Sequence, residues 1–347
     1  MPGATIVHAA AFAVGALVGG GVVSAVSARR QRHQIPVASV PATAPIISPP
    51  VVDVTPGGVT QISPQAATPV SVLKYGNPGP ISDQLVRIAY AAGYDRRLRH
   101  PAWAAEHLTL ASLGKSALAS ASSDEKGDRQ NSHFTEDQSI PAMFRAKLQD
   151  YFRSGYDRGH MVPAADCKLS QAAMNETFLL TNIAPQVGVG FNRHYWAYVE
   201  DWCRRLTSTF ADVYVFTIPL YLPKLDSDGK WRITHEVIGS PPNVSVPTHF
   251  AKVVLTAKPS SPSTPDVPEI STGAFVLPNA VIPDEAKLES FVVPIEAVEK
   301  AAGLTLFSDA IKKNSKHICK TTKCEVTVRK FDDAQKNAQR KAITGPR

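Results

Sequence analysis

The segment from Pro36 to Pro69 most constrains how this chain can fold. It contains eight prolines and a single charged residue, Asp53. Proline donates no backbone hydrogen bond and fixes φ, so such a stretch neither pairs in a sheet nor builds a core. We interpret it as an extended tether, with a tail of no particular role as the alternative. Only the part that follows can form a core, so we expect one folded domain in the 347 residues.

The N-terminal residues 4–28 contain no Asp, Glu, Lys or Arg and are rich in Ala, Gly and Val. They are long enough for one membrane span, which takes ~20 apolar residues. Basic residues follow this run, at Arg29, Arg30 and Arg32, whereas a secretory signal peptide carries them in front. We therefore expect a membrane anchor or an organelle-targeting presequence. The predicted boundaries are residues 1–33 for this segment and 34–74 for the linker.

The chain is basic, with a net charge of +7. This balance favours acidic partners such as nucleic acid or anionic lipid, although charge alone fits a basic soluble protein equally well. From Ile311 onward there are eleven Lys and Arg against three acids. We predict a basic C-terminal extension over residues 311–347, either a solvated tail or a segment that follows a phosphate backbone.

Four cysteines are too few for a disulfide scaffold. Cys319 and Cys324 have no companion pair at a zinc-binding spacing, so we expect two reduced thiols. A disulfide between them is the alternative in an oxidising compartment. Cys167 fits a buried structural residue better than a redox-sensitive thiol.

Residues 75–310 are predicted to form the folded domain, with mixed α+β structure. The runs 87–94 and 101–108 fit a helix or a strand equally well, because alanine is abundant in them. The segment 111–126 reads as a loop or insertion. Clearer patterns predict strands at 212–219, 231–238 and 249–255, and helices at 192–206 and 295–303.

The ten residues from Asp157 to Asp166 carry the most specific chemistry in the sequence. His160 can accept a proton near neutral pH, and Arg158 can hold a phosphate through two parallel hydrogen bonds. Gly159 lets the backbone pass close to a ligand. This combination suits phosphodiester cleavage, but by itself it fits a surface loop about as well.

The helix at 192–206 adds a metal-binding pattern. Asn192, Trp196 and Glu200 are spaced four residues apart, so they fall near one face. Mg²⁺ keeps several of its waters and takes few protein ligands. We therefore predict Asn192 as the direct ligand and Glu200 as a partner of a metal-bound water. His160 is then free to act as the general base.

Three motifs together carry a family resemblance. They are Asp157-Arg-Gly-His160, Thr181-Asn182-Ile-Ala-Pro-Gln186, and Phe191-Asn192-Arg-His-Tyr-Trp196 continuing to Glu200. The chain resembles the DNA/RNA non-specific endonuclease family from about Tyr75 to Phe307, and it is most similar to the mitochondrial endonuclease G branch.

The resemblance implies an α+β fold built on a ββα-metal (His-Me finger) core, with a mixed or antiparallel central sheet flanked by helices. It implies one Mg²⁺, with Mn²⁺ as a substitute, and cleavage of DNA and RNA through contacts with the phosphate backbone. It also implies a homodimer in mitochondria, at the inner membrane or in the intermembrane space, with residues 4–28 as a membrane contact. By motif position, it assigns His160 as the general base and Asn192 as the metal ligand. Asn182 and Glu200 would support the geometry of the water and the histidine. Arg129 would stabilise the phosphate, and Arg158 would be a further phosphate contact.

Two other functions fit parts of the sequence. A nucleic-acid-binding or scaffold protein could share this fold without catalysis, but such a protein would be expected to have lost one of the polar residues. Here His160, Asn192, Glu200 and Arg129 are all present. A secreted scavenging nuclease would need a cleavable signal peptide, which the first residues do not resemble.

Overall fold

The computed structural model describes residues 80–115, 126–261 and 263–328. The predicted N-terminal segment, the proline-rich linker and residues 75–79 lie outside these ranges, as does most of the predicted insertion at 111–126. Within the ranges that are described, no helix is long and apolar enough to cross a membrane.

A central eight-stranded sheet organises the fold, in the order β1-β2-β3-β6-β11-β12-β13, with β14 pairing against β12. Every pairing in it is antiparallel except that of β14 with β12. The α+β prediction is therefore confirmed, and the two ambiguous runs are strands. The strands are β1 (Ser82–Val86), β2 (Tyr90–Asp95), β3 (His100–Leu108), β6 (Asp212–Leu220), β11 (His249–Ser261), β12 (Thr264–Pro278), β13 (Val292–Val293) and β14 (Lys316–His317).

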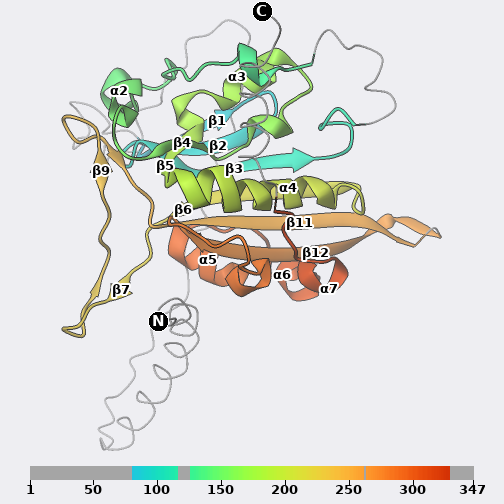
Figure 1. Cartoon of the computed structure of the whole chain (residues 1–347). Helices are drawn as coiled ribbons and strands as arrows, with labels where there is room; N and C mark the ends of the chain where they lie inside the picture. Colours follow the sequence, from blue (N-terminus) through green and yellow to red (C-terminus); the bar gives the residue numbers. More distant parts are fainter. Residues whose placement is uncertain (1–79, 116–125, 262, 329–347) are drawn as a thin grey trace, which may run out of the picture. The chain divides into compact units, whose positions relative to one another are not determined.

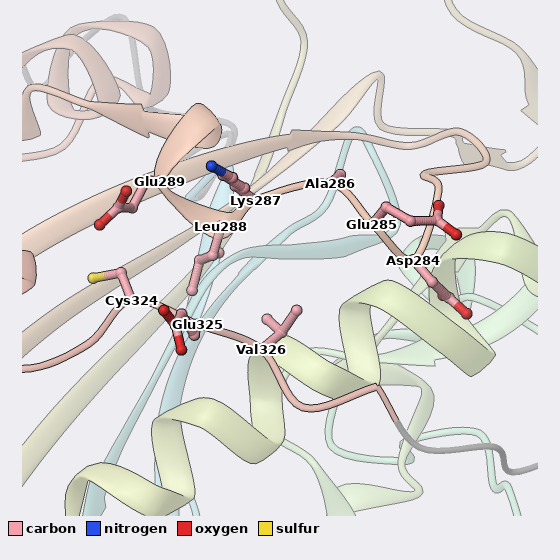
Figure 2. A pocket seen from close by; sticks show the side chains of 9 residues that line it. All are labelled: Asp284, Glu285, Ala286, Lys287, Leu288, Glu289, Cys324, Glu325 and Val326. Atoms are coloured by element: carbon pink, nitrogen blue, oxygen red, sulfur yellow. The ribbon is translucent and has the colours of Figure 1, made fainter.

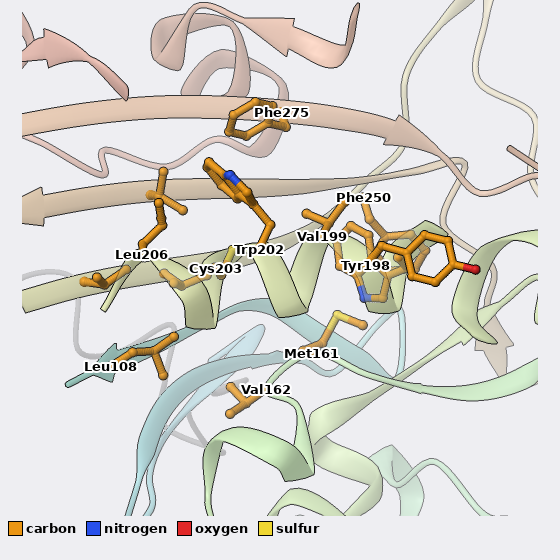
Figure 3. Packing of buried hydrophobic residues seen from close by; sticks show 14 of the residues in the cluster. Leu108, Met161, Val162, Tyr198, Val199, Trp202, Cys203, Leu206, Phe250 and Phe275 are labelled. Carbon is orange, nitrogen blue, oxygen red and sulfur yellow. The ribbon is translucent and has the colours of Figure 1, made fainter. Parts of the chain in front are cut away.

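Helices cover both faces of this sheet (Figure 1). The helix α4 (Trp196–Leu206) lies along one face, where Val199, Trp202 and Leu206 pack against Phe250 and Phe275 of the sheet (Figure 3). On the opposite face, α5 (Ile295–Ala302) covers a second apolar cluster. The apolar spacing of three and four along α4 explains why this helix is buried on one side. Both helices were predicted from the sequence.

A smaller antiparallel pair next to α4 carries the motif residues. Strand β4 (Asp157–His160) pairs with β5 (Ile183–Gln186), and His160 lies opposite Ile183. The chain then forms the π-helical turn η8 (Gly188–Tyr195) and continues as α4. This succession of two strands and a helix has the ββα order expected from the motifs. The helix at 192–206 thus begins with wider π-type hydrogen bonding, as in the bond from Asn192 N to Val187 O at 2.9 Å.

The remaining elements are short and connect these layers. They are η4 (Arg129–Asn131), η5 (Ala142–Phe144), α2 (Leu148–Tyr151), η6 (Ala164–Asp166), α3 (Gln171–Thr177), η7 (Leu180–Asn182), β7 (Lys224–Leu225), β8 (Trp231–Arg232), β9 (Val237–Ile238), β10 (Val244–Ser245), η9 (Leu288–Phe291), α6 (Asp309–Asn314) and α7 (Ile318–Thr321).

The prediction of one strand over 231–238 is wrong. Its first two residues form β8 and pair with β7, whereas its last two form β9 and pair with β10. The segment is divided between two hairpins, and residues 233–236 pair with neither. Alternating exposed residues such as Trp231, Ile233 and Val237 produced the strand-like pattern.

The prediction of reduced thiols at Cys319 and Cys324 is also wrong. The two residues form a disulfide, with their Cα atoms 5.2 Å apart. The single turn of α7 brings the chain back on itself, and the buried Ile318 side chain anchors that turn on the core. Residues 311–328 of the predicted basic extension thus contribute α6, β14 and α7 to the fold. Cys167 is buried, as expected, and burial raises the pKa of its thiol.

Breaking this disulfide should lower the free energy of unfolding by about 2 kcal/mol, because it closes only a short loop in the unfolded chain. Guanidinium unfolding of the Cys319→Ser/Cys324→Ser variant against the parent measures the change. Adding a reductant should destabilise the parent and leave the double variant unaffected. Equal stability of the two proteins would contradict the prediction.

Candidate active site

His160 ends strand β4 and lies in an apolar setting. Its ring packs against Phe134 and Phe178, with centroid distances of 5.4 and 4.8 Å, and only 8% of the residue is exposed. Burial, together with the nearby positive charge of Arg129, lowers the pKa of His160 to about 3. Its Nε2 atom is buried, and no described residue forms a hydrogen bond with it. The imidazole is therefore neutral at physiological pH and can accept a proton.

Asn182 holds the chain directly after His160 in place. Its Oδ1 accepts a hydrogen bond from Val162 N at 3.0 Å, and its Nδ2 donates to Val162 O and Thr177 O at 2.9 Å each. The residue is fully buried, and both amide hydrogens are used on the backbone. Asn182 thus fixes the backbone of the residues that directly follow His160.

Two arginines lie over the two aromatic rings that pack against His160. The Arg158 guanidinium lies 4.4 Å from the Phe134 ring centroid, and the Arg129 guanidinium lies 5.4 Å from that of Phe178. Both arginines are exposed, and neither forms a salt bridge with the described part of the chain. Two positive charges are thus held beside His160 and remain available for an anion.

The structure ties Asn192 to the strand that carries the histidine. Asn192 Nδ2 donates to Asp157 Oδ2 at 2.9 Å, and Arg193 Nε donates to the same oxygen at 2.7 Å. Burial would raise the pKa of Asp157, but these hydrogen bonds lower it overall, so the carboxylate is ionised. Because the amide nitrogen is engaged, Asn192 directs its Oδ1 elsewhere. Gly190, with φ of 84°, makes the turn that leads into this segment.

Gln186 is the last residue of the second motif and had no predicted role. It is fully buried, and neither its Nε2 nor its Oε1 has a hydrogen-bond partner among the described residues. It lies opposite Asp157 in the β4–β5 pair, and its side chain fills the space over Gly159. A Cβ atom at position 159 would be 2.0 Å from Gln186 Oε1, which explains the glycine there.

Glu200 lies two turns beyond Asn192 and is half-buried. Burial raises its pKa to about 7, while the positive charges of Lys252, Arg204 and Arg129 oppose that rise. Arg129 acts electrostatically on both His160 and Glu200. Its guanidinium therefore lies close enough to His160 and to Glu200 to influence the charge of both.

The oxygen donors near His160 could hold a hard cation that keeps most of its waters. The described residues include no group of three or more His, Cys, Asp or Glu that could hold a metal ion. Mg²⁺ needs no such cage, because it binds through one or two oxygen ligands and keeps several waters. Asn192 Oδ1 would be the direct ligand. The unpaired amide of Gln186 and the Glu200 carboxylate would hold metal-bound waters.

A separate cavity of about 340 Å³ lies between residues 284–289 and 324–326 (Figure 2). None of the predicted site residues lines it. Four carboxylates surround it, from Asp284, Glu285, Glu289 and Glu325, with Lys287 as the only basic residue. This charge would repel a phosphate backbone, so the cavity is not part of the site around His160.

The chain is similar to known nucleases over most of its length. The model of the family described as DNA/RNA non-specific endonuclease matches residues 69–313. "Nuclease 1, mitochondrial" of Schizosaccharomyces pombe is 50% identical over 267 residues, which cover 77% of this chain and 79% of that protein. "Endonuclease G, mitochondrial" of Bos taurus is 38% identical over 242 residues, covering 70% and 74%.

The fold is also similar to a solved one. A chain in the crystal structure of the EndoG/EndoGI complex superposes with a TM-score of 0.60 at 42% identity. The superposition covers 72% of this chain and 96% of that chain.

His160 should stay neutral far below the ordinary histidine pKa of 6.5. The histidine NMR signals can be followed as the pH is lowered from 8 to the point where the protein unfolds. Free histidine in the same sample should become protonated first, while His160 is still unprotonated. Because the folded-state pKa is depressed, the unfolded chain binds an extra proton below pH 6.5. The stability contributed by this residue is therefore complete above pH 6.5 and is lost as the pH falls towards 3. Titration of His160 near pH 6.5 would refute this.

Proposed function

The chain belongs to the DNA/RNA non-specific endonuclease family and hydrolyses phosphodiester bonds, and from this premise we propose that His160 is its general base. The observation that carries the proposal is the grouping of His160, Arg129 and Arg158 on the rings of Phe134 and Phe178. A neutral imidazole beside two uncommitted guanidinium groups suits attack of water on a phosphate.

In the proposed reaction, His160 removes a proton from a water molecule. The water oxygen forms a bond to phosphorus, and the bond between phosphorus and the leaving oxygen breaks. His160 is unprotonated at neutral pH, so a ring nitrogen is free to take the proton. Asn182 fixes the loop that follows the base, so it is a positioning residue.

Arg129 and Arg158 would bind the phosphate oxygens. Arg129 is the better candidate for stabilising the charge that develops during the reaction, because its charge acts on both His160 and Glu200. Arg158 follows Asp157 on β4 and would contact a phosphate on the other side of the histidine. Neither role reads a base, which suits cleavage of both DNA and RNA.

The family is metal-dependent. We propose Mg²⁺ as the ion, with Mn²⁺ as a substitute, held by Asn192 Oδ1 with Glu200 on a bound water. Such an ion supplies positive charge to the phosphate and the leaving oxygen. Asp157 keeps the Asn192 amide in the orientation that leaves its oxygen available.

The named relatives include mitochondrial nucleases. We propose that this chain also acts in mitochondria, at the inner membrane or in the intermembrane space, with residues 4–28 as an anchor or a removable presequence. Sequencing the N-terminus of the protein from purified mitochondria, with carbonate extraction, distinguishes the two. We further propose a homodimer, and sedimentation of the purified protein as a monomer would refute that.

His160→Ala should abolish cleavage, because no other neutral base replaces the imidazole, and should leave binding to DNA largely intact. Plasmid nicking with Mg²⁺ measures the first, and a gel-shift assay measures the second. His107→Ala is the matched control, since His107 is a partly exposed histidine paired with Asp212. A His160→Ala protein that nicks DNA like the parent would overturn the mechanism.

Asn192→Ala should lower cleavage at millimolar Mg²⁺ by about 10²-fold or more, because the direct metal ligand is lost. Higher Mg²⁺ should restore part of the activity, and a Mg²⁺ titration of nicking rates measures this. Asn314→Ala, on the distant helix α6, is the control. An unchanged dependence on Mg²⁺ would rule out Asn192 as the ligand.

A further inference from the structure

Lys252 is a buried cation to which the proposed reaction gives no role. It lies on β11 and is only 1% exposed. No carboxylate of the described residues lies within 4.0 Å of its Nζ atom. A buried charge without an ion pair is costly and needs other partners. The groups around its Nζ atom therefore indicate the role of this lysine.

The ammonium group of Lys252 contacts three groups around the site. Its Nζ donates a hydrogen bond to Thr217 Oγ1 on β6 at 2.7 Å and lies 3.5 Å from Met161 O. It also lies 5.2 Å from the ring centroid of Trp196. Met161 directly follows the base His160. Trp196 begins α4, between the metal ligand and Glu200. One cation therefore contacts both halves of the site and the sheet below them.

The sheet register places Lys252 in a polar patch of the sheet. Lys252 pairs with Thr217 across β11 and β6, and Thr217 pairs with Ala104 of β3. Glu106, two residues further along β3, thus lies on the same sheet face. Burial and the neighbouring Asp166 carboxylate hold the pKa of Glu106 well above its usual range, against the opposing charge of Lys252. Glu106 therefore lies near Lys252 and interacts with it electrostatically, but the two form no ion pair within 4.0 Å.

A second buried contact ties the same two halves. Asp166, at the end of the histidine motif, accepts a hydrogen bond from Arg204 Nη1 at 2.8 Å. Arg204 lies one helical turn beyond Glu200 on α4, and both partners of this pair are largely buried. The segment 160–166 is thus fixed to α4 at Asp166. The contact of Lys252 with Met161 O fixes the same segment next to His160.

We propose that Lys252 is a positioning residue for phosphodiester cleavage, whose buried ammonium sets the place of His160 relative to Asn192 and Glu200 by binding Met161 O, Thr217 and the Trp196 ring. Its effect on turnover rests on the proposed function, whereas its effect on the order of residues 160–166 does not depend on that function. Because a misplacement of about 1 Å can cost on the order of 10²-fold in rate, a neutral residue here should impair turnover more than DNA binding.

The test is Lys252→Met, which keeps an unbranched side chain of nearly the same length and removes the charge. Lys258→Met is the matched control, because Lys258 lies on the same strand, is partly exposed and interacts with Glu269. We expect kcat on plasmid DNA to fall by on the order of 10²-fold, with KM changed by less than about threefold. In the metal-free protein, amide hydrogen exchange should speed up in residues 160–166 and 196–200. The control should match the parent in both measurements.

A Lys252→Met protein that turns over and exchanges like the parent overturns the proposal. If this variant does not fold, Thr217→Val decides the matter, because it keeps the charge and removes the hydroxyl that holds it. Faster exchange at residues 160–166 in Thr217→Val supports the proposal, and unchanged exchange refutes it. If the parent itself does not cleave DNA, the proposed function fails, and the exchange data still decide whether Lys252 orders the loop.

Discussion

The hydrogen bonds that Asp157 accepts hold the two halves of the site in one geometry. Asp157 begins the strand that ends at His160, and it receives Asn192 Nδ2 and the Arg193 guanidinium from the turn before α4. Its carboxylate is ionised, so these are charge-assisted bonds. They fix the orientation of the Asn192 amide and connect β4 with the turn that leads into α4.

Buried polar atoms near the site fall into two kinds. Asn182 uses both of its amide hydrogens and its oxygen on the backbone, so it is a structural residue. His160 Nε2 and the Gln186 amide are buried without a partner among the described residues. Leaving such groups unpaired costs free energy, which is why they mark positions where water, metal or substrate would supply the missing contact.

The sequence predicted those core elements that have strong local signals. The helix at 192–206 and the strand at 212–219 follow from apolar spacing. The proposed roles of His160 and Asn192 come from short motifs, from chemistry and from spacing. The long-range partners could not be found in this way. Lys252 is far from His160 in sequence, and only the pairing of β11 with β6 brings its ammonium beside Met161.

Local patterns also failed where tertiary contacts decide. The disulfide between Cys319 and Cys324 depends on the turn of α7, which the anchoring of Ile318 on the core stabilises. Phe134 and Phe178 gave no signal, because an aromatic residue in a loop usually packs in a core. Their role as supports for His160 and two arginines becomes visible only once the hairpin and the preceding loop are placed together.

The arrangement also explains why such an enzyme can be indifferent to sequence and sugar. Arg129 and Arg158 present guanidinium groups, which match phosphate oxygens, and the role proposed for His160 is to act on water. None of these roles involves a base edge or a 2′-hydroxyl, which are the groups that distinguish sequences and RNA from DNA. Recognition of the backbone alone is thus sufficient for catalysis. Precision has to come from within the protein, and the contacts of Asp157, Asn182 and Lys252 are placed to supply it.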